Sequence, residues 1–229
     1  MDNIKKLELV IFDMDGLLID SEKISIQAWK NVIKKYKINI NEEEFIKNIV
    51  GSNIIYFKYS LIKLFKDDKT YLSFIDDHNK ETFKIAENEG IEVKTGANEL
   101  IEYLLLNKIK IALASSSFRN KVNKYLNKIN LYDKFDYIVC GEDVDNVKPY
   151  PDIYNKICNY FEIDKNNIVI LEDSKNGLLS AKNSGIEKRF YIPDIFYLSN
   201  KDKNELAYKT FSNLLEVKDY LIDNKIIES

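Results

Sequence analysis

The sequence predicts an α/β protein in which helices cover a parallel sheet and a helical segment interrupts the chain after the first strand. Residues 7–12 (LELVIF) contain a continuous apolar run from Leu9 to Phe12, which is typical of a strand buried on both faces. From Val93 to Ile192, helical and strand-like patterns alternate along the chain. Such alternation favours a parallel sheet with helices in its crossover connections.

The segment after the first strand, residues 17–92, is expected to be helical throughout. Apolar residues recur every three or four positions over residues 21–36, which predicts an amphipathic helix. Helical spacing and capping residues predict two shorter helices over residues 41–51 and 53–65. A longer helix is predicted over residues 70–89, and the glycine that follows, Gly90, is expected to end it. We interpret this segment as an all-helical cap inserted into the sheet domain.

The remaining elements are expected to complete the sheet and its helical layers. The predicted helices span residues 98–107, 118–129, 153–161 and 175–184, and the predicted strands span residues 110–114, 137–139, 168–171 and 188–192. Residues 1–16 and 93–229 would then form the core domain, and residues 17–92 the cap.

Composition excludes several classes of partner. The chain has 229 residues, of which 45% are hydrophobic, and its 34 Lys and Arg residues nearly balance its 37 Asp and Glu residues. No overall field would therefore attract nucleic acid or an acidic membrane surface. The sequence contains neither an apolar run of about 18 residues nor a signal-peptide pattern. We expect a cytoplasmic monomer or weak dimer, in which Cys140 and Cys158 are packed thiols.

Polar residues follow the predicted strands at the edge where open parallel sheets bind ligands. They comprise carboxylates, hydroxyls and one ammonium: Asp13, Asp15, Ser115, Ser116, Ser117, Lys148, Glu172 and Asp173. Taken singly, each motif could be a turn or a helix cap. Their succession at consecutive strand ends of one sheet favours a common site.

If these groups converge, four carboxylates face Lys148 alone. Two carboxylates about 4 Å apart repel by roughly 4 kcal/mol at an effective dielectric constant near 20. A bound cation would remove this conflict, and oxygen ligands without His or Cys favour Mg²⁺. We therefore expect Mg²⁺ to lie between the Asp13–Asp15 pair and a phosphoryl group.

The same residues could carry out phosphoryl transfer. Asp13 could attack phosphorus to form an aspartyl phosphate. Asp15 could protonate the leaving oxygen and later deprotonate the attacking water. Lys148, the Ser115 hydroxyl and the Ser116 amide would hold the equatorial oxygens of the phosphoryl group.

Four segments resemble, in order and spacing, the motifs of the haloacid dehalogenase superfamily, in its phosphatase and β-phosphoglucomutase-like branch. They are residues 13–22 (DMDGLLIDSE), Ser115, residues 148–152 (KPYPD) and residues 171–174 (LEDS). The resemblance covers nearly the whole chain, and it implies a Rossmann-like core, an α-helical cap, Mg²⁺ dependence and an aspartyl-phosphate intermediate. By position, Asp13 resembles the nucleophile and Asp15 the acid/base. The phosphate-binding residues implied are Ser115, Ser116 and Lys148, and the metal ligands implied are Asp13, the main-chain carbonyl of Asp15, Glu172 and Asp173.

Departures from the mutase pattern favour a phosphatase. Mutases of this branch carry a histidine near the position of Ser25 and an arginine after the cap glycine, here Gly51. We therefore predict a Mg²⁺-dependent phosphatase of a small phosphorylated metabolite, with a sugar phosphate as the preferred class. The alternatives are a β-phosphoglucomutase-like mutase and a non-catalytic phospholigand-binding protein. His78, the only histidine of the sequence, is expected to be half-buried or at the surface.

Overall fold

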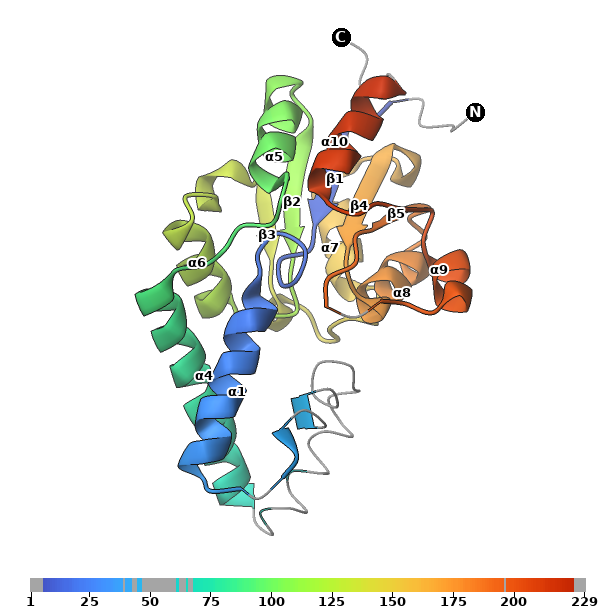
Figure 1. Ribbon diagram of the computed structural model, residues 1–229. Coiled ribbons are helices and arrows are strands. Elements are labelled where there is room, and N and C mark those ends of the chain that lie inside the picture. The colour runs from blue at the N-terminus through green and yellow to red at the C-terminus, as the bar shows by residue number, and fades with distance from the viewer. Residues whose placement is uncertain are drawn as a thin grey trace. The chain divides into compact units, whose positions relative to one another are not determined.

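The computed structural model describes residues 6–224 apart from residues 39, 43–44, 47–60, 62–64, 66–67 and 196. The chain divides into two compact units (Figure 1). One unit, here called the core unit, comprises Met1–Asp20 and Glu92–Ser229, and the other, the helical unit, comprises Ser21–Ile91. In the described part of the chain, no helix is both long and apolar enough to cross a membrane.

The core unit is built on a parallel sheet, as the sequence predicts. Its described strands are β1 (Leu9–Phe12), β2 (Lys110–Ala114), β3 (Tyr137–Val139), β4 (Ile168–Glu172), β5 (Lys188–Tyr191) and β6 (Lys209–Thr210). They are ordered β3-β2-β1-β4-β5-β6. β1 pairs in parallel with β2 on one side and with β4 on the other. The strand order therefore reverses at β1, the position at which open α/β sheets bind ligands.

Helices cover both faces of this sheet. The described helices of the core unit are α5 (Ala97–Leu106), α6 (Arg119–Lys128), α7 (Asp152–Phe161), α8 (Lys175–Asn183), α9 (Asn200–Leu206) and α10 (Leu214–Asp223). Ile11 belongs to an apolar cluster with residues of α7 and α8. The opposite face carries Phe190, whose ring packs at 5.7 Å against Tyr220 of α10, and α5 packs against α10. Double coverage explains why all four residues of β1 are buried and apolar.

The helical unit contains α1 (Ser21–Lys35) and α4 (Asp68–Glu89), which pack against each other. Trp29, Val32 and Phe74 form its apolar cluster. His78 is more deeply buried than predicted, because its ring stacks on Trp29 with the ring centroids 3.6 Å apart. The predicted helices over residues 41–51 and 53–65 lie largely outside the described residues.

The prediction that helical structure begins at residue 17 is wrong. Residues 17–20 form a turn within the core unit, where the amides of Leu18 and Ile19 both donate to the Met14 carbonyl. Ile19 also bridges to Val93, and the Asp20 amide donates to the Glu92 carbonyl. The compact units accordingly divide after Asp20, four residues beyond the expected boundary.

Gly96 provides a test of how closely the core elements pack. Its φ is 85°, and a Cβ at this position would lie 2.0 Å from the Leu215 amide nitrogen. Gly185 has a similar φ of 79°, but the nearest atom to such a Cβ, Lys165 Nζ, would be 3.7 Å away. Both alanine variants therefore share the backbone strain, and only Gly96→Ala adds a steric clash.

We expect Gly96→Ala to lower the free energy of unfolding by roughly 1–3 kcal/mol more than Gly185→Ala, the usual cost of overpacking. Urea denaturation followed by circular dichroism measures both values. Equal losses in the two variants would show that α10 does not pack on Gly96 as described.

Candidate active site

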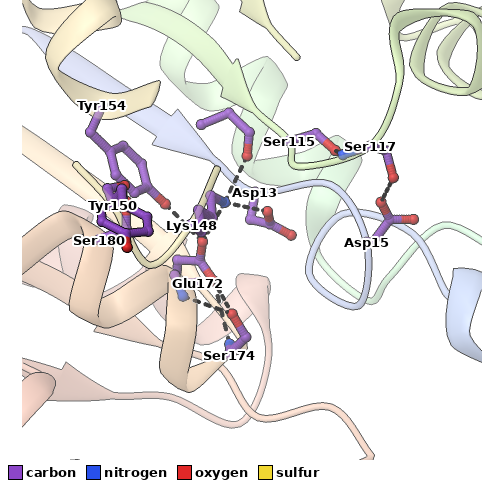
Figure 2. A network of polar contacts seen from close by, with 12 residues as sticks. Asp13, Asp15, Ser115, Ser117, Lys148, Tyr150, Tyr154, Glu172, Ser174 and Ser180 are labelled. Atoms are coloured by element: carbon purple, nitrogen blue, oxygen red, sulfur yellow. Dashed lines mark hydrogen bonds and ion pairs between the residues drawn. The ribbon is translucent and has the colours of Figure 1, made fainter. Parts of the chain in front are cut away.

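A buried lysine joins the ends of three neighbouring strands. Lys148 Nζ donates hydrogen bonds to Asp13 Oδ1 at 2.5 Å, to Glu172 Oε1 at 2.5 Å and to the Ala114 carbonyl at 2.8 Å (Figure 2). The Lys148 side chain is only 5% exposed. Asp13 directly follows β1, Glu172 ends β4 and Ala114 ends β2. The structure therefore brings together three of the predicted strand ends.

The loop that carries Lys148 is fixed by α8. Ser180 Oγ donates to the Tyr150 carbonyl at 2.5 Å, and Asn183 Nδ2 donates to the Pro149 carbonyl at 3.3 Å. These contacts hold the two residues that follow Lys148, which lies at the start of this loop. Lys148 is thus positioned in two ways. Hydrogen bonds from α8 fix the backbone that follows it, and carboxylates bind its ammonium.

Glu172 is enclosed by hydrogen-bond donors. Besides Lys148, Oε1 accepts from Tyr154 Oη at 2.7 Å, and Oε2 accepts from Ser174 Oγ at 3.1 Å. A Cβ on Gly177 would lie 1.9 Å from this carboxylate, so only glycine fits at that position of α8. Sequence reasoning missed Tyr154, because a tyrosine on an apolar helix face is usually a packing residue.

An acidic cluster surrounds this lysine. Asp13, Glu172 and Asp173 each offer a carboxylate oxygen within 4.8 Å of the others. Asp194, which the sequence analysis did not select, has a buried Oδ2 without a hydrogen-bond partner among the described residues. A Cβ on Gly16 would lie 2.3 Å from Asp173 Oδ2 and 3.1 Å from Asp194 Oδ2, so the glycine turn borders both carboxylates.

The residues present fit a magnesium ion. The donor atoms of the cluster are all carboxylate oxygens, which Mg²⁺ prefers. The Asp194 oxygen that lacks a partner would be a suitable acceptor for a hydrogen bond from a metal-bound water. Without a cation, the Lys148 ammonium alone faces the clustered carboxylates of Asp13, Glu172 and Asp173, which is unfavourable in a buried site.

Burial and repulsion between the carboxylates change the pKa values of the site. Burial raises the pKa of Asp13 to about 8; Lys148 opposes the rise, and the charge of Glu172 adds to it. Burial also raises the pKa of Asp173 well above its usual range, and the neighbouring carboxylates act in the same direction. Burial disfavours the charged form of Lys148, but Asp13 and Glu172 outweigh burial and raise the pKa of its amine. The metal-free cluster therefore retains protons near neutral pH.

The serine cluster lies at the end of β2, beside this lysine. Ser115 is buried, and its Oγ accepts from the Ser117 amide at 3.1 Å. Ser116 is exposed in the turn before α6. In the described part of the chain, neither the Ser115 nor the Ser116 hydroxyl is hydrogen-bonded to the acidic cluster. Ser115 directly follows Ala114, whose carbonyl accepts a hydrogen bond from Lys148.

The two aspartates of the first motif have different partners. Asp13 contacts Lys148, whereas Asp15 Oδ2 accepts from Ser117 Oγ at 2.7 Å (Figure 2). Asp15 Oδ1 accepts from Lys121 Nζ at 2.8 Å. Sequence reasoning did not select Lys121 for this site. A lysine on a predicted helix is usually solvated, so nothing in the local sequence indicated a contact between Lys121 and Asp15.

The fold and the site define an α/β protein with a cluster of carboxylates around the buried Lys148 at the switch point of its parallel sheet. The model of one family, described as haloacid dehalogenase-like hydrolase, matches residues 10–189. The chain belongs to this family, as its motifs predict.

Named relatives and solved structures agree with this assignment. The chain is 28% identical over 188 residues to the phosphorylated carbohydrates phosphatase of Thermotoga maritima, covering 81% of this chain and 85% of the relative. It is 24% identical over 196 residues to the 6-phosphogluconate phosphatase of Escherichia coli, covering 82% of this chain and 84% of the relative. A crystal structure of a Thermotoga maritima protein, provisionally named β-phosphoglucomutase, has a TM-score of 0.80 and 26% identity, and the match covers 95% of this chain and 99% of that one.

The raised pKa of Asp13 predicts how the stability of the metal-free protein depends on pH. Since this pKa is about 8 in the folded protein against an ordinary 3.8, the folded state binds more protons than the unfolded state between these values. The resulting stabilisation is complete below the ordinary pKa and is lost as the pH rises through the folded pKa. In EDTA, the melting temperature should therefore fall between about pH 5.5 and about pH 8.

Calorimetry in EDTA at several pH values measures this trend. Asp13→Asn removes one titrating group and should make the fall shallower. Added Mg²⁺ should raise the melting temperature most at the alkaline end, where the carboxylates are free of protons. A melting temperature that rises with pH over this window would contradict the assignment.

Proposed function

We propose that the protein is a Mg²⁺-dependent phosphatase that hydrolyses a small phosphorylated metabolite, preferably a sugar phosphate, through an aspartyl-phosphate intermediate. The main support is the Asp13 carboxylate held on the buried Lys148 ammonium within an acidic cluster. Family membership and the phosphatase names of the two relatives described above support the same reaction class. Their named substrates, phosphorylated carbohydrates and 6-phosphogluconate, favour a sugar phosphate.

In this proposal, Asp13, Asp173, Glu172 and the main-chain carbonyl of Asp15 would hold Mg²⁺. When bound, the ion would supply positive charge that lowers the repulsion between the Asp13 carboxylate and the phosphoryl oxygens. Glu172 would also keep Lys148 in place, because it accepts hydrogen bonds from Lys148 and Tyr154.

The protein residues would carry two displacements. An Asp13 oxygen forms a bond to phosphorus while the bond between phosphorus and the substrate oxygen breaks, and Asp15 gives that oxygen a proton. Water then attacks phosphorus, Asp15 accepts a proton from the water, and the bond between Asp13 and phosphorus breaks to release inorganic phosphate. Lys148, Ser115 Oγ and the Ser116 amide hold the phosphoryl oxygens during both displacements.

One observation keeps a sugar-phosphate mutase as the second candidate. Mutases carry a histidine near the position of Ser25, and this chain has none there in its sequence. In the helical unit, however, His78 Nε2 lies 3.3 Å from Ser25 Oγ. An imidazole from α4 therefore stands beside the position that mutases fill from the first cap helix. Conversion of a hexose 1-phosphate into its 6-phosphate without free phosphate would identify a mutase.

The nucleophile is tested by Asp13→Asn. The purified protein should release inorganic phosphate from members of a panel of sugar phosphates only when Mg²⁺ is present. The variant should lose at least about 10³-fold in kcat, because an amide cannot form the acyl phosphate. Asp133→Asn, which removes an exposed aspartate of the core unit, is the matched control. Turnover retained by Asp13→Asn would exclude this residue as the nucleophile.

The metal assignment is tested by Asp173→Ala. We expect the Mg²⁺ concentration for half-maximal phosphate release to rise about tenfold or more, because one carboxylate ligand is lost. A Mg²⁺ titration of the initial rate measures this concentration for the variant and the unmodified protein. An unchanged value would remove Asp173 from the metal ligands.

A further inference from the structure

One side of α6 presents a row of three residues to the first motif. Ser117, Lys121 and Tyr125 are spaced by four residues, so they lie on the same side of the helix and of the turn before it. Lys121 Nζ donates to Ser117 Oγ at 3.3 Å and lies 5.5 Å from the centre of the buried Tyr125 ring. The ammonium of Lys121 is therefore held by Ser117 and by the ring of Tyr125.

This row holds both oxygens of the Asp15 carboxylate. Ser117 Oγ binds Oδ2 at 2.7 Å and Lys121 Nζ binds Oδ1 at 2.8 Å. Two donors on separate oxygens restrict the rotation of the carboxylate as well as its position. The side chains of Lys121 and Asp15 are 28% and 22% exposed, so this ion pair is better shielded from solvent than a surface pair.

We propose that Lys121 is a positioning residue for the proton transfer by Asp15, with Ser117 as the second holding group. This inference rests on the proposed phosphatase function, in which Asp15 exchanges a proton with the leaving oxygen. A general acid or base acts only within hydrogen-bond reach of the atom it serves, so fixing its carboxylate favours the reaction. Lys121 acts through Asp15, in contrast to Lys148, which contacts the nucleophile itself.

The dependence of the rate on the leaving group distinguishes positioning of the acid from other roles. An alkyl phosphate needs a proton on its leaving oxygen, whereas 4-nitrophenyl phosphate releases a stable phenolate. In Lys121→Met, kcat/KM should fall about tenfold or more for an alkyl phosphate and much less for 4-nitrophenyl phosphate. Lys121→Arg keeps a charged donor and should restore part of the loss. Lys128→Met, an exposed lysine on the same helix, is the matched control and should behave as the unmodified protein.

A second pair of variants separates positioning from folding. Ser117→Ala removes the other donor and should change the ratio of the two kcat/KM values in the same direction, by a smaller factor. In an Asp15→Asn background, Lys121→Met should cause no further loss of kcat/KM on 4-nitrophenyl phosphate, because the group that it positions is already absent.

Three results would overturn the inference. They are an unchanged kcat/KM in Lys121→Met, an equal loss for both substrates, and a loss that persists in the Asp15→Asn background. An equal loss would assign Lys121 to substrate binding or to folding. Failure of the unmodified protein to release phosphate from any monoester would instead refute the proposed function, so the two failures are distinguishable.

Discussion

The buried ammonium of Lys148 is the interaction on which the site depends. It binds Asp13, Glu172 and the Ala114 carbonyl, and so links the ends of β1, β4 and β2. A buried charge is tolerated only when its hydrogen bonds are satisfied, and removing one partner leaves the other charge uncompensated. Lys148 therefore links the strands at which the strand order reverses. It also orients Asp13, the proposed nucleophile.

The lysine alone does not neutralise the site. Burial and mutual repulsion raise the pKa values of Asp13 and Asp173, so the metal-free cluster is held together partly by bound protons. A divalent cation that replaces these protons would supply the charge that phosphoryl transfer requires. Asp15 instead contacts Ser117 and Lys121, so the two aspartates of the first motif have separate surroundings.

Local sequence patterns were enough to predict most of the fold and part of the candidate site. Asp13, Lys148 and Glu172 could be predicted because each lies in a short segment with its own turn or strand signal. The contact between Lys121 and Asp15 spans 106 residues and depends on where α6 lies against β1, which no local pattern records. Helix α10 was not predicted, although asparagine, a preferred N-cap residue, stands directly before it. In the structure, Asn213 accepts a hydrogen bond from the Glu216 amide as the N-cap of this helix.

Displacement of protons by a divalent cation from the carboxylates around Lys148 can be measured by calorimetric titration of Mg²⁺ into the metal-free protein. The titration is done at about pH 7 in two buffers of different ionisation enthalpy. We expect the two heats to differ in the direction of proton release, because Asp13 has a pKa of about 8 before the ion binds. Equal heats in both buffers, or proton uptake, would contradict it.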